Sequence, residues 1–304
     1  MSNLFNLLKR IDLLVYEEKY YPYLLGGSKA RKLRSILEHA KSLAANAIVS
    51  AGSSSSNHAR DCAIACAQLG WQCKLVIHDL EDYSINNLFL MKLAGAELIF
   101  CKMNEVAEKM DSVMEELRKE NATPYYIWGG GHSVHGTKAF FDAAKHFVDQ
   151  NPNWQPDFVI VPSGTGGTQA GLHVGFAVSS PKTKVIGISV AREKKRGLQA
   201  VQGAVHEVIK YLNINTPIDS TPIFLDKWRG EGYGKTYPRL IKIVGDAAKM
   251  GILTDTTYTG KALCALCEMI SDGEIKKNSK VLFWHTGGIM NLMDDKKSLL
   301  SLCK

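Results

Sequence analysis

The sequence predicts an α/β protein built on mostly parallel β-sheets. Short runs of continuous apolar and β-branched residues recur along the chain, a glycine- or serine-rich turn follows most of them, and a helical pattern comes next. Continuous apolar strands that alternate with helices are typical of parallel sheets covered on both faces. These runs lie at residues 47–52, 74–79, 96–102, 124–131, 157–167, 184–190 and 280–288.

The composition indicates an ordinary soluble globular protein. The chain has 304 residues, of which 45% are hydrophobic and 22% charged, and this length allows one or two domains. No segment approaches the roughly 18 to 20 unbroken apolar residues of a membrane span, so no membrane partner is expected. The first residues show no basic region followed by a continuous apolar one, so we expect no secretory signal and a cytoplasmic location.

Charge and cysteine content argue against a nucleic-acid-binding, a disulfide-rich or a zinc-binding protein. The formal net charge is +7, without a block of five or more like charges, which suits small anions at least as well as nucleic acid. No helix shows a basic stripe, so no nucleic-acid partner is expected. The seven scattered cysteines favour reduced thiols. Cys264 and Cys267 form a CxxC pair that allows redox chemistry or half a zinc site, but the surrounding helical pattern favours buried thiols and no metal.

The chain is expected to form two α/β lobes. Polar and proline residues in the segment FVDQNPNWQPD interrupt the alternation of strands and helices near residues 143–155. Ligands of such folds bind at the carboxyl ends of the strands, and clefts between lobes are frequent binding sites. We therefore expect the active site in the cleft between the lobes.

One strand-to-helix turn has the features of an anion site. Residues 157–172, DFVIVPSGTGGTQAGL, read as a buried strand, a loop with three glycines and two threonines, and a helix that begins near Thr168. Backbone N–H groups at a helix start favour a phosphate. Gln169 breaks the GxGxxG dinucleotide fingerprint, and Thr137 and Lys138 stand in the wrong order for a P-loop. A tight turn that needs glycine only for its geometry remains an alternative.

Two further segments could carry chemistry. In GGSKARKL (26–33), two glycines precede Lys29, so a ligand could approach the backbone and the lysine closely, although most lysines are solvated surface residues. In SAGSSSSNHAR (50–60), four serines, Asn57 and His58 lie between a strand end and a helix, where a carboxylate would be favoured. Helix capping by the serines explains the second segment equally well.

Together these segments resemble the fold-type-II pyridoxal-phosphate enzymes that include 1-aminocyclopropane-1-carboxylate (ACC) deaminase and D-cysteine desulfhydrase. GGSKARKL is similar to the family's GGNKxRKLE, SSSSNHAR to QSNHxRQ, and PSGTGGTQAGL to TGSGGTxAGL. DTTYTGKAL and VLFWHTGG are similar to its later YxGK and HTGG segments. The resemblance implies a tryptophan synthase β-like fold of two three-layer lobes, with residues 1–33 and 145–304 in the large lobe and 34–144 in the small one. It also implies pyridoxal 5′-phosphate as cofactor, a small amino-acid substrate and a homodimer.

The resemblance also implies roles for individual residues. Lys29 would carry the cofactor as a Schiff base and move the Cα proton, and Asn57 would bind the cofactor's 3-hydroxyl. The phosphate would be held by Thr165, Gly166, Gly167 and Thr168, with charge added by Lys32. The substrate would meet Ser56, Asn57, His58, Tyr233 and Tyr258, of which Ser56 and the two tyrosines are also candidate catalytic residues. Thr259 and Thr286 would lie by the pyridine nitrogen and the substrate.

The residues at positions 259 and 286 favour one reaction within that family. Members similar to this chain that open the cyclopropane ring carry Glu and Leu at these positions, whereas the D-cysteine type carries small hydroxyl residues. A carboxylate beside the pyridine nitrogen keeps that nitrogen protonated, so the cofactor ring withdraws electrons strongly, whereas a threonine leaves this withdrawal weaker. Loss of a thiolate from Cβ needs less electron withdrawal than ring opening does. The sequence therefore predicts D-cysteine desulfhydrase-like β-elimination, with ACC deamination as the alternative.

Other positions depart from the family pattern and keep different functions open. Ser28 replaces the usual Asn, and the loop GGGHSVHG brings His132 and His135 near the expected cleft. No third metal ligand is evident, so substrate contact or a plain surface position is favoured over a metal. A non-catalytic cofactor- or amino-acid-binding relative fits these departures. A nicotinamide-dependent oxidoreductase would use the same architecture but lacks its fingerprint.

Overall fold

The protein divides into two compact units. The computed structural model describes residues 3–18, 26–218 and 220–300. Unit 1 comprises Met1–Lys19 and Thr137–Lys304, and unit 2 comprises Tyr20–Gly136. These units differ from the lobes expected from the sequence in the assignment of residues 20–33 and 137–144.

Unit 1 is built on a five-stranded parallel sheet with the order β1-β9-β6-β7-β8. The pairing of Glu17 with His285 and of Ser163 with Ser189 brings the carboxyl ends of neighbouring strands to one edge. The strands are β1 (Asp12–Glu17), β9 (Lys280–His285), β6 (Phe158–Ser163), β7 (Lys184–Ser189) and β8 (Ile223–Leu225).

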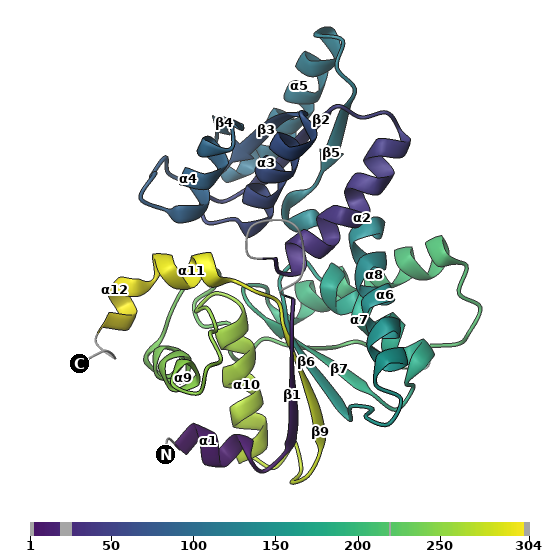
Figure 1. Cartoon of the computed structure of the whole chain (residues 1–304), viewed down its shortest axis with the longest axis vertical. Helices are drawn as coiled ribbons and strands as arrows, with labels where there is room; N and C mark the ends of the chain where they lie inside the picture. Colours follow the sequence, from purple (N-terminus) through teal and green to yellow (C-terminus); the bar gives the residue numbers. More distant parts are fainter. Residues whose placement is uncertain (1–2, 19–25, 219, 301–304) are drawn as a thin grey trace. The chain divides into compact units, whose positions relative to one another are not determined.

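Helices cover both faces of this sheet, as Figure 1 shows. Successive side chains of a strand point to opposite faces, so Ile160 of β6 joins the core formed with α10, whereas Val159 and Val161 join the core around Trp284. The helices are α1 (Asn3–Leu8), α6 (Val134–Gln150), α7 (Gly167–Ser179), α8 (Lys194–Leu212), α9 (Pro238–Ala248), α10 (Thr259–Ser271), α11 (Ile289–Asp294) and α12 (Lys296–Leu299).

Unit 2 repeats this construction on a four-stranded parallel sheet with the order β4-β3-β2-β5. Ile48 of β2 packs in the core with α2 and α3, and Val49 packs on the other face with α5. The strands are β2 (Ala47–Gly52), β3 (Gln72–Ile77), β4 (Glu97–Phe100) and β5 (Pro124–Ile127). The helices are α2 (Ser28–Ser42), α3 (Asn57–Leu69), α4 (Asn86–Leu93) and α5 (Val106–Lys119), with short 3-10 turns at Met103–Glu105 and Gly129–Gly131.

The expected fold class is confirmed. Each of the seven apolar runs contains or overlaps an observed strand, and helices alternate with them. Cys264 and Cys267 lie buried as free thiols inside α10, which confirms that interpretation of the CxxC pair. Within the described ranges, no helix combines the length and apolar character that crossing a membrane requires.

Candidate functional site

The turn after β6 has the construction of an anion site. Gly166 adopts φ +94°, and a side chain there would bring a Cβ within 3.1 Å of the backbone nitrogen of Val201, so glycine is required for both reasons. The thirteen-residue helix α7 begins at Gly167, and its first N–H groups have no partners within the helix. These groups and the helix dipole favour a bound phosphate.

Side chains around this turn add polar atoms. The Oγ of Ser163 is buried and has no hydrogen-bond partner among the described residues. Thr165 is partly buried and Thr168 is buried. An unpartnered buried hydroxyl costs free energy unless a ligand satisfies it, so Ser163 joins the four turn residues expected from the sequence.

The two tyrosines expected on the substrate side lie together in unit 1. The hydroxyls of Tyr233 and Tyr258 are 2.6 Å apart, and their rings meet edge to face with centroids 5.8 Å apart. Burial, together with Tyr233, raises the pKa of Tyr258 well above its ordinary value. Tyr258 therefore keeps its proton at neutral pH, and the hydroxyl pair can donate or relay one.

Thr259 follows Tyr258 and is bonded to a carboxylate that sequence reasoning overlooked. Asp255 accepts hydrogen bonds from the backbone nitrogens of residues 257, 258 and 259, at 2.8–2.9 Å. It also accepts from the hydroxyl of Thr259 at 2.6 Å, and its own N–H donates to that oxygen at 3.0 Å. Burial raises the pKa of Asp255 while these bonds oppose the rise. The segment DTTY before an apolar helix was the available signal.

Thr286 lies in the turn after β9, which approaches the same aspartate. Its neighbour His285 bonds the carbonyl of Leu253 through Nε2 at 2.9 Å. A Cβ on Gly288 would come within 2.7 Å of the carboxyl carbon of Asp255. Glycine at this position therefore allows the HTGG turn and the start of α10 to pack against each other.

Lys29 stands at the beginning of α2 in unit 2. Its Nζ donates to the carbonyl of Gly130 at 3.1 Å. Burial lowers the pKa of this amine to about 8, although the negative charge of Asp61 raises it in part. A buried lysine with a lowered pKa is a candidate nucleophile or base, because a substantial fraction is neutral near physiological pH.

Lys32 lies one turn further along α2 and is also buried. Burial, and then the like charge of Lys29, lowers the pKa of Lys32 well below its ordinary value. The two amines thus disfavour each other's charged form. A bound anion would offset that repulsion.

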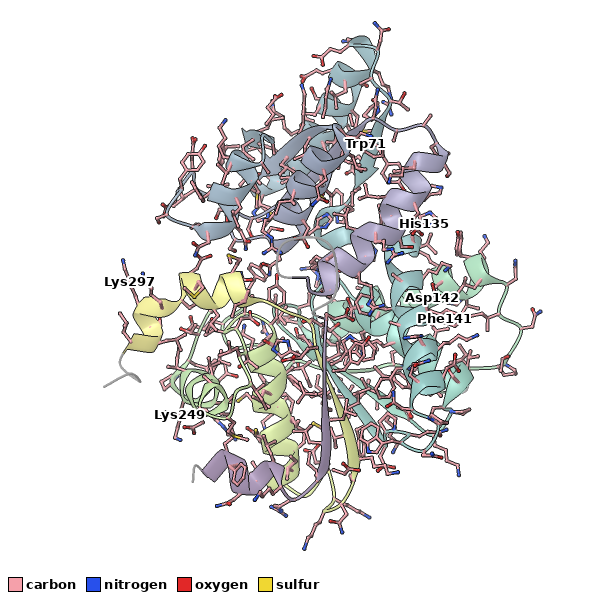
Figure 2. The ribbon with its side chains drawn as sticks, in the orientation of Figure 1. Trp71, His135, Phe141, Asp142, Lys249 and Lys297 are labelled. Carbon is pink, nitrogen blue, oxygen red and sulfur yellow. The ribbon has the colours of Figure 1, made fainter. Side chains whose placement is uncertain are left out.

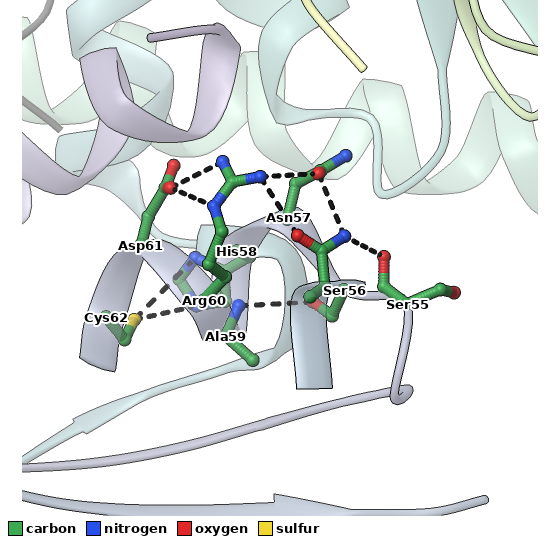
Figure 3. A network of polar contacts seen from close by, with 9 residues as sticks. Ser55, Ser56, Asn57, His58, Ala59, Arg60, Asp61 and Cys62 are labelled. Atoms are coloured by element: carbon green, nitrogen blue, oxygen red, sulfur yellow. Dashed lines mark hydrogen bonds and ion pairs between the residues drawn. The ribbon is translucent and has the colours of Figure 1, made fainter. Parts of the chain in front are cut away.

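The start of α3 collects the residues expected to bind a carboxylate. Ser56 caps the helix, and its Oγ accepts from the backbone nitrogen of Ala59 at 3.2 Å. The side-chain oxygen of Asn57 accepts from Arg60 Nη1 at 3.0 Å and from Asn87 at 3.1 Å. Figure 3 shows the bonds around Arg60, which fix the orientation of the Asn57 amide.

Asp61 completes this network and was not expected from the sequence. Its Oδ1 accepts from Nε and Nη2 of Arg60, at 3.0 and 2.6 Å, while its buried Oδ2 has no partner among the described residues (Figure 3). Burial raises the pKa of Asp61 to about 6 against the influence of Arg60 and Lys29. The family pattern has Gln at this position, and that difference was the available signal.

The side chains of His58 and His135 contact other residues of the protein. His58 is buried and bonds Ser50 at 3.0 Å, and burial, Lys29 and Lys32 lower its pKa to about 3, so it is neutral. Its contact with substrate stays a prediction. His135, labelled in Figure 2, stacks on His39 with ring centroids 3.9 Å apart. No group of three or more metal-ligating side chains occurs in the described part of the chain.

The expected residues thus form one set in each unit. Lys29, Lys32, Ser56, Asn57 and His58 belong to unit 2. Thr165, Gly166, Gly167, Thr168, Tyr233, Tyr258, Thr259 and Thr286 belong to unit 1. Within unit 1 the residues lie at or near carboxyl ends of parallel strands or on α10 beside them, where α/β folds bind ligands.

Comparisons with known proteins identify the family of the chain. The family model described as "Pyridoxal-phosphate dependent enzyme" matches residues 3–287. The chain is 30% identical to 1-aminocyclopropane-1-carboxylate deaminase of Burkholderia vietnamiensis over 87% of its own length and 82% of the relative's. It is 29% identical to D-cysteine desulfhydrase of Klebsiella pneumoniae over 91% of its own length and 87% of the relative's.

A solved structure described as an ACC deaminase homologue superposes with a TM-score of 0.90 and 28% identity, covering 99% of this chain and 91% of that one. This likeness confirms the expected fold type, and the relatives confirm the resemblance read from the sequence. The chain belongs to the pyridoxal-phosphate dependent enzymes, in the group of ACC deaminases and D-cysteine desulfhydrases.

Proposed function

We propose that the protein is a D-cysteine desulfhydrase-like lyase that converts D-cysteine and water to pyruvate, ammonia and hydrogen sulfide. In this proposal Lys29 carries pyridoxal phosphate, and Thr165, Gly166, Gly167 and Thr168 hold its phosphate group. The hydroxyl of residue 259, in place of a carboxylate, is the observation that favours this reaction.

The side chains fit the cofactor. The turn at Gly166 leaves little room for a Cβ and offers helix N–H groups, and the buried Oγ of Ser163 lacks a partner among the residues described. These are the donors that a phosphate group requires. Lys29 supplies an amine with a pKa of about 8, and Asn57 supplies an amide of fixed orientation for a ring hydroxyl.

The protein's own groups would then handle the protons. When bound, pyridoxal phosphate withdraws electrons from the substrate's Cα and so makes its proton acidic. We assign removal of that proton to the neutral amine of Lys29, which its lowered pKa makes available. The start of α3, capped by Ser56, would bind the substrate carboxylate through backbone N–H groups.

The tyrosine pair would serve the leaving group. A thiolate that leaves Cβ needs a proton to depart as hydrogen sulfide. The hydroxyls of Tyr233 and Tyr258 are within hydrogen-bond distance of each other, and Tyr258 keeps its proton at neutral pH. One hydroxyl can therefore donate to the sulfur while the other stabilises the oxygen that has given up its proton.

The choice of reaction rests on the surroundings of residue 259. Thr259 carries no charge, and the nearby Asp255 already accepts bonds from three backbone N–H groups and the Thr259 hydroxyl. Neither group offers an uncommitted carboxylate to a pyridine nitrogen. The bound cofactor would then withdraw electrons less strongly. β-Elimination of a thiolate requires less electron withdrawal than ring opening does.

The test is to incubate the purified, cofactor-loaded enzyme with D-cysteine, L-cysteine, D-serine and ACC separately while following its visible spectrum. We expect sulfide and pyruvate from D-cysteine at a higher rate than 2-oxobutanoate from ACC. A faster release of 2-oxobutanoate would establish ACC deamination, the alternative that the Burkholderia relative favours. A cofactor band without turnover of any of the four would indicate a binding protein.

We also propose a homodimer, because the family resemblance implies one. Sedimentation equilibrium should give twice the chain mass of 33.5 kDa. A species of single-chain mass at all concentrations would contradict this.

A further inference from the structure

Lys261 is a buried lysine to which neither the sequence nor the proposed mechanism assigns a role. It lies in the first turn of α10, and its side chain has no solvent exposure. Its Nζ donates to the carbonyls of Val190 at 3.0 Å, Arg229 at 2.8 Å and Gly232 at 2.8 Å. An ammonium has three N–H donors, so each carbonyl receives one.

The three carbonyls belong to two segments far apart in sequence. Val190 directly follows β7, whereas Arg229 and Gly232 belong to the irregular segment 226–237 between β8 and α9. In that segment Gly230, Gly232 and Gly234 all have positive φ, and no strand pairing fixes it. Such a segment can adopt many conformations, so cross-links from outside it decide which one it keeps.

Tyr233 is the residue next to the clamped carbonyl of Gly232. Its hydroxyl meets that of Tyr258, which lies three positions before Lys261. The lysine therefore ties the backbone beside one tyrosine to the helix that begins beside the other.

Burial of this ammonium costs desolvation free energy, so other interactions must offset that cost. The hydrogen bonds that Nζ makes within the described residues all go to carbonyls and none to a carboxylate. A buried charge without a bonded counter-ion is less favourable than an apolar side chain of similar volume. An apolar side chain at this position could not make the three bonds, and so could not fix the conformation of the loop.

We propose that Lys261 is a positioning residue whose ammonium clamps the 226–237 segment and thereby holds the Tyr233 hydroxyl against that of Tyr258. The clamp itself is independent of the proposed function. The assignment of the tyrosine pair to the substrate side is the one part that rests on the proposed function.

The clamp should respond to pH. Burial lowers the pKa of Lys261 to about 8, with Asp255 raising it and Arg229 lowering it. These two are the charged groups that act on the amine, and Arg229 is itself paired with Glu193. A neutral amine keeps two donors for three carbonyls, so one carbonyl loses its bond and faces a lone pair. The segment is therefore held more firmly below pH 8 than above it.

Hydrogen exchange of the cofactor-loaded enzyme tests this proposal without requiring turnover. Lys261→Met should raise exchange within 226–237 about tenfold or more, while peptides of β6 and the interior of α10 keep their protection. The matched control is Lys242→Met, which removes an exposed lysine paired with Asp246 on neighbouring α9 and should change nothing in this segment. Lys261→Arg should restore part of the protection.

The wild-type enzyme supplies a second measurement that does not depend on the variant folding. After correction for intrinsic exchange, protection of 226–237 should fall as pH rises through about 8, and this fall should be absent in Lys261→Met. Unchanged protection of the segment in the variant, or a uniform loss in all peptides, would overturn the proposal. If the segment responds as expected but D-cysteine is not consumed, the clamp stands and the proposed function fails.

Discussion

Lys29 combines a place at the start of α2 with a pKa lowered to about 8, and both properties bear on cofactor capture. Only the neutral amine can attack an aldehyde, so capture of pyridoxal phosphate by cofactor-free protein should speed up as pH rises through about 8 and level off above it. Stopped-flow absorbance measures this rate. A capture rate that keeps rising toward pH 10.5, the ordinary lysine value, would contradict the assignment.

The same shift has a consequence for stability, with a definite sign. Between about pH 8 and 10.5 the folded state binds fewer protons at Lys29 than the unfolded state, so this lysine's burial cost falls as pH rises through that window. Lys29→Met should therefore stabilise the cofactor-free protein at pH 7, by at most about 3 kcal/mol, and by progressively less above pH 8. Urea unfolding measures the difference, and Lys41→Met, at an exposed position of the same helix, should give none.

Thr259 and Asp255 form a buried pair, and the two bonds that involve the Thr259 hydroxyl should contribute measurably to stability. Thr259→Val removes both hydroxyl bonds, keeps the backbone bond to Asp255 and leaves the buried carboxylate one donor short, which should cost about 1–3 kcal/mol. Thr259→Ser keeps the hydroxyl and should cost clearly less. Chemical denaturation of the cofactor-free variants measures both, and equal losses would show that the hydroxyl bonds contribute nothing.

At the scale of elements, the turn from β6 into α7 depends on one glycine. Gly166→Ala would impose a side chain at φ +94° and within 3.1 Å of Val201 N, so we expect destabilisation of about 1–3 kcal/mol and weaker binding of pyridoxal phosphate. Gly203→Ala, in helix α8, meets no atom within 4 Å and should be neutral or slightly stabilising. Thermal unfolding and cofactor titration distinguish the two. Similar behaviour of both variants would refute a special role for the turn.

The elements that the sequence revealed are the ones with continuous apolar runs. β2, β6, β7 and β9 are buried on both faces, so a run such as FVIV carries a clear signal. β8 escaped notice because it has only three residues, and β1 because it is a partly exposed edge strand with no glycine- or serine-rich turn after it. The edge strands β4 and β5 of the other sheet are also partly exposed, but each forms a recognisable apolar run.

The site residues also divide into those that a local sequence pattern marks and those that it does not. Motif residues such as Gly166 and Tyr258 could be named from the sequence because glycine turns and family segments mark them. The roles of Asp255, Asp61 and Lys261 could not be read in this way, although Lys261 stands in the YxGK segment, because these roles arise from contacts between folded side chains and backbone or from burial. The bond of Lys261 to Val190, 71 positions away, has no local signal.

At the scale of the whole molecule, the chain uses one construction twice. Each unit is a parallel sheet between helices, and the candidate residues of unit 1 gather near the edge where its parallel strands end. Unit 2 contains Lys29 and the start of α3, whereas unit 1 contains the Gly166 turn and the tyrosine pair. The two-fold use of this fold explains why the motifs are spread over almost the full chain.

Lys29 is the residue that we propose to hold the cofactor. Borohydride reduction of the loaded enzyme makes that attachment permanent, and peptide mass mapping then locates the modified lysine. We predict the phosphopyridoxyl group on the peptide that contains Lys29. Its presence instead on Lys32, on Lys261 or on no lysine at all would contradict the account.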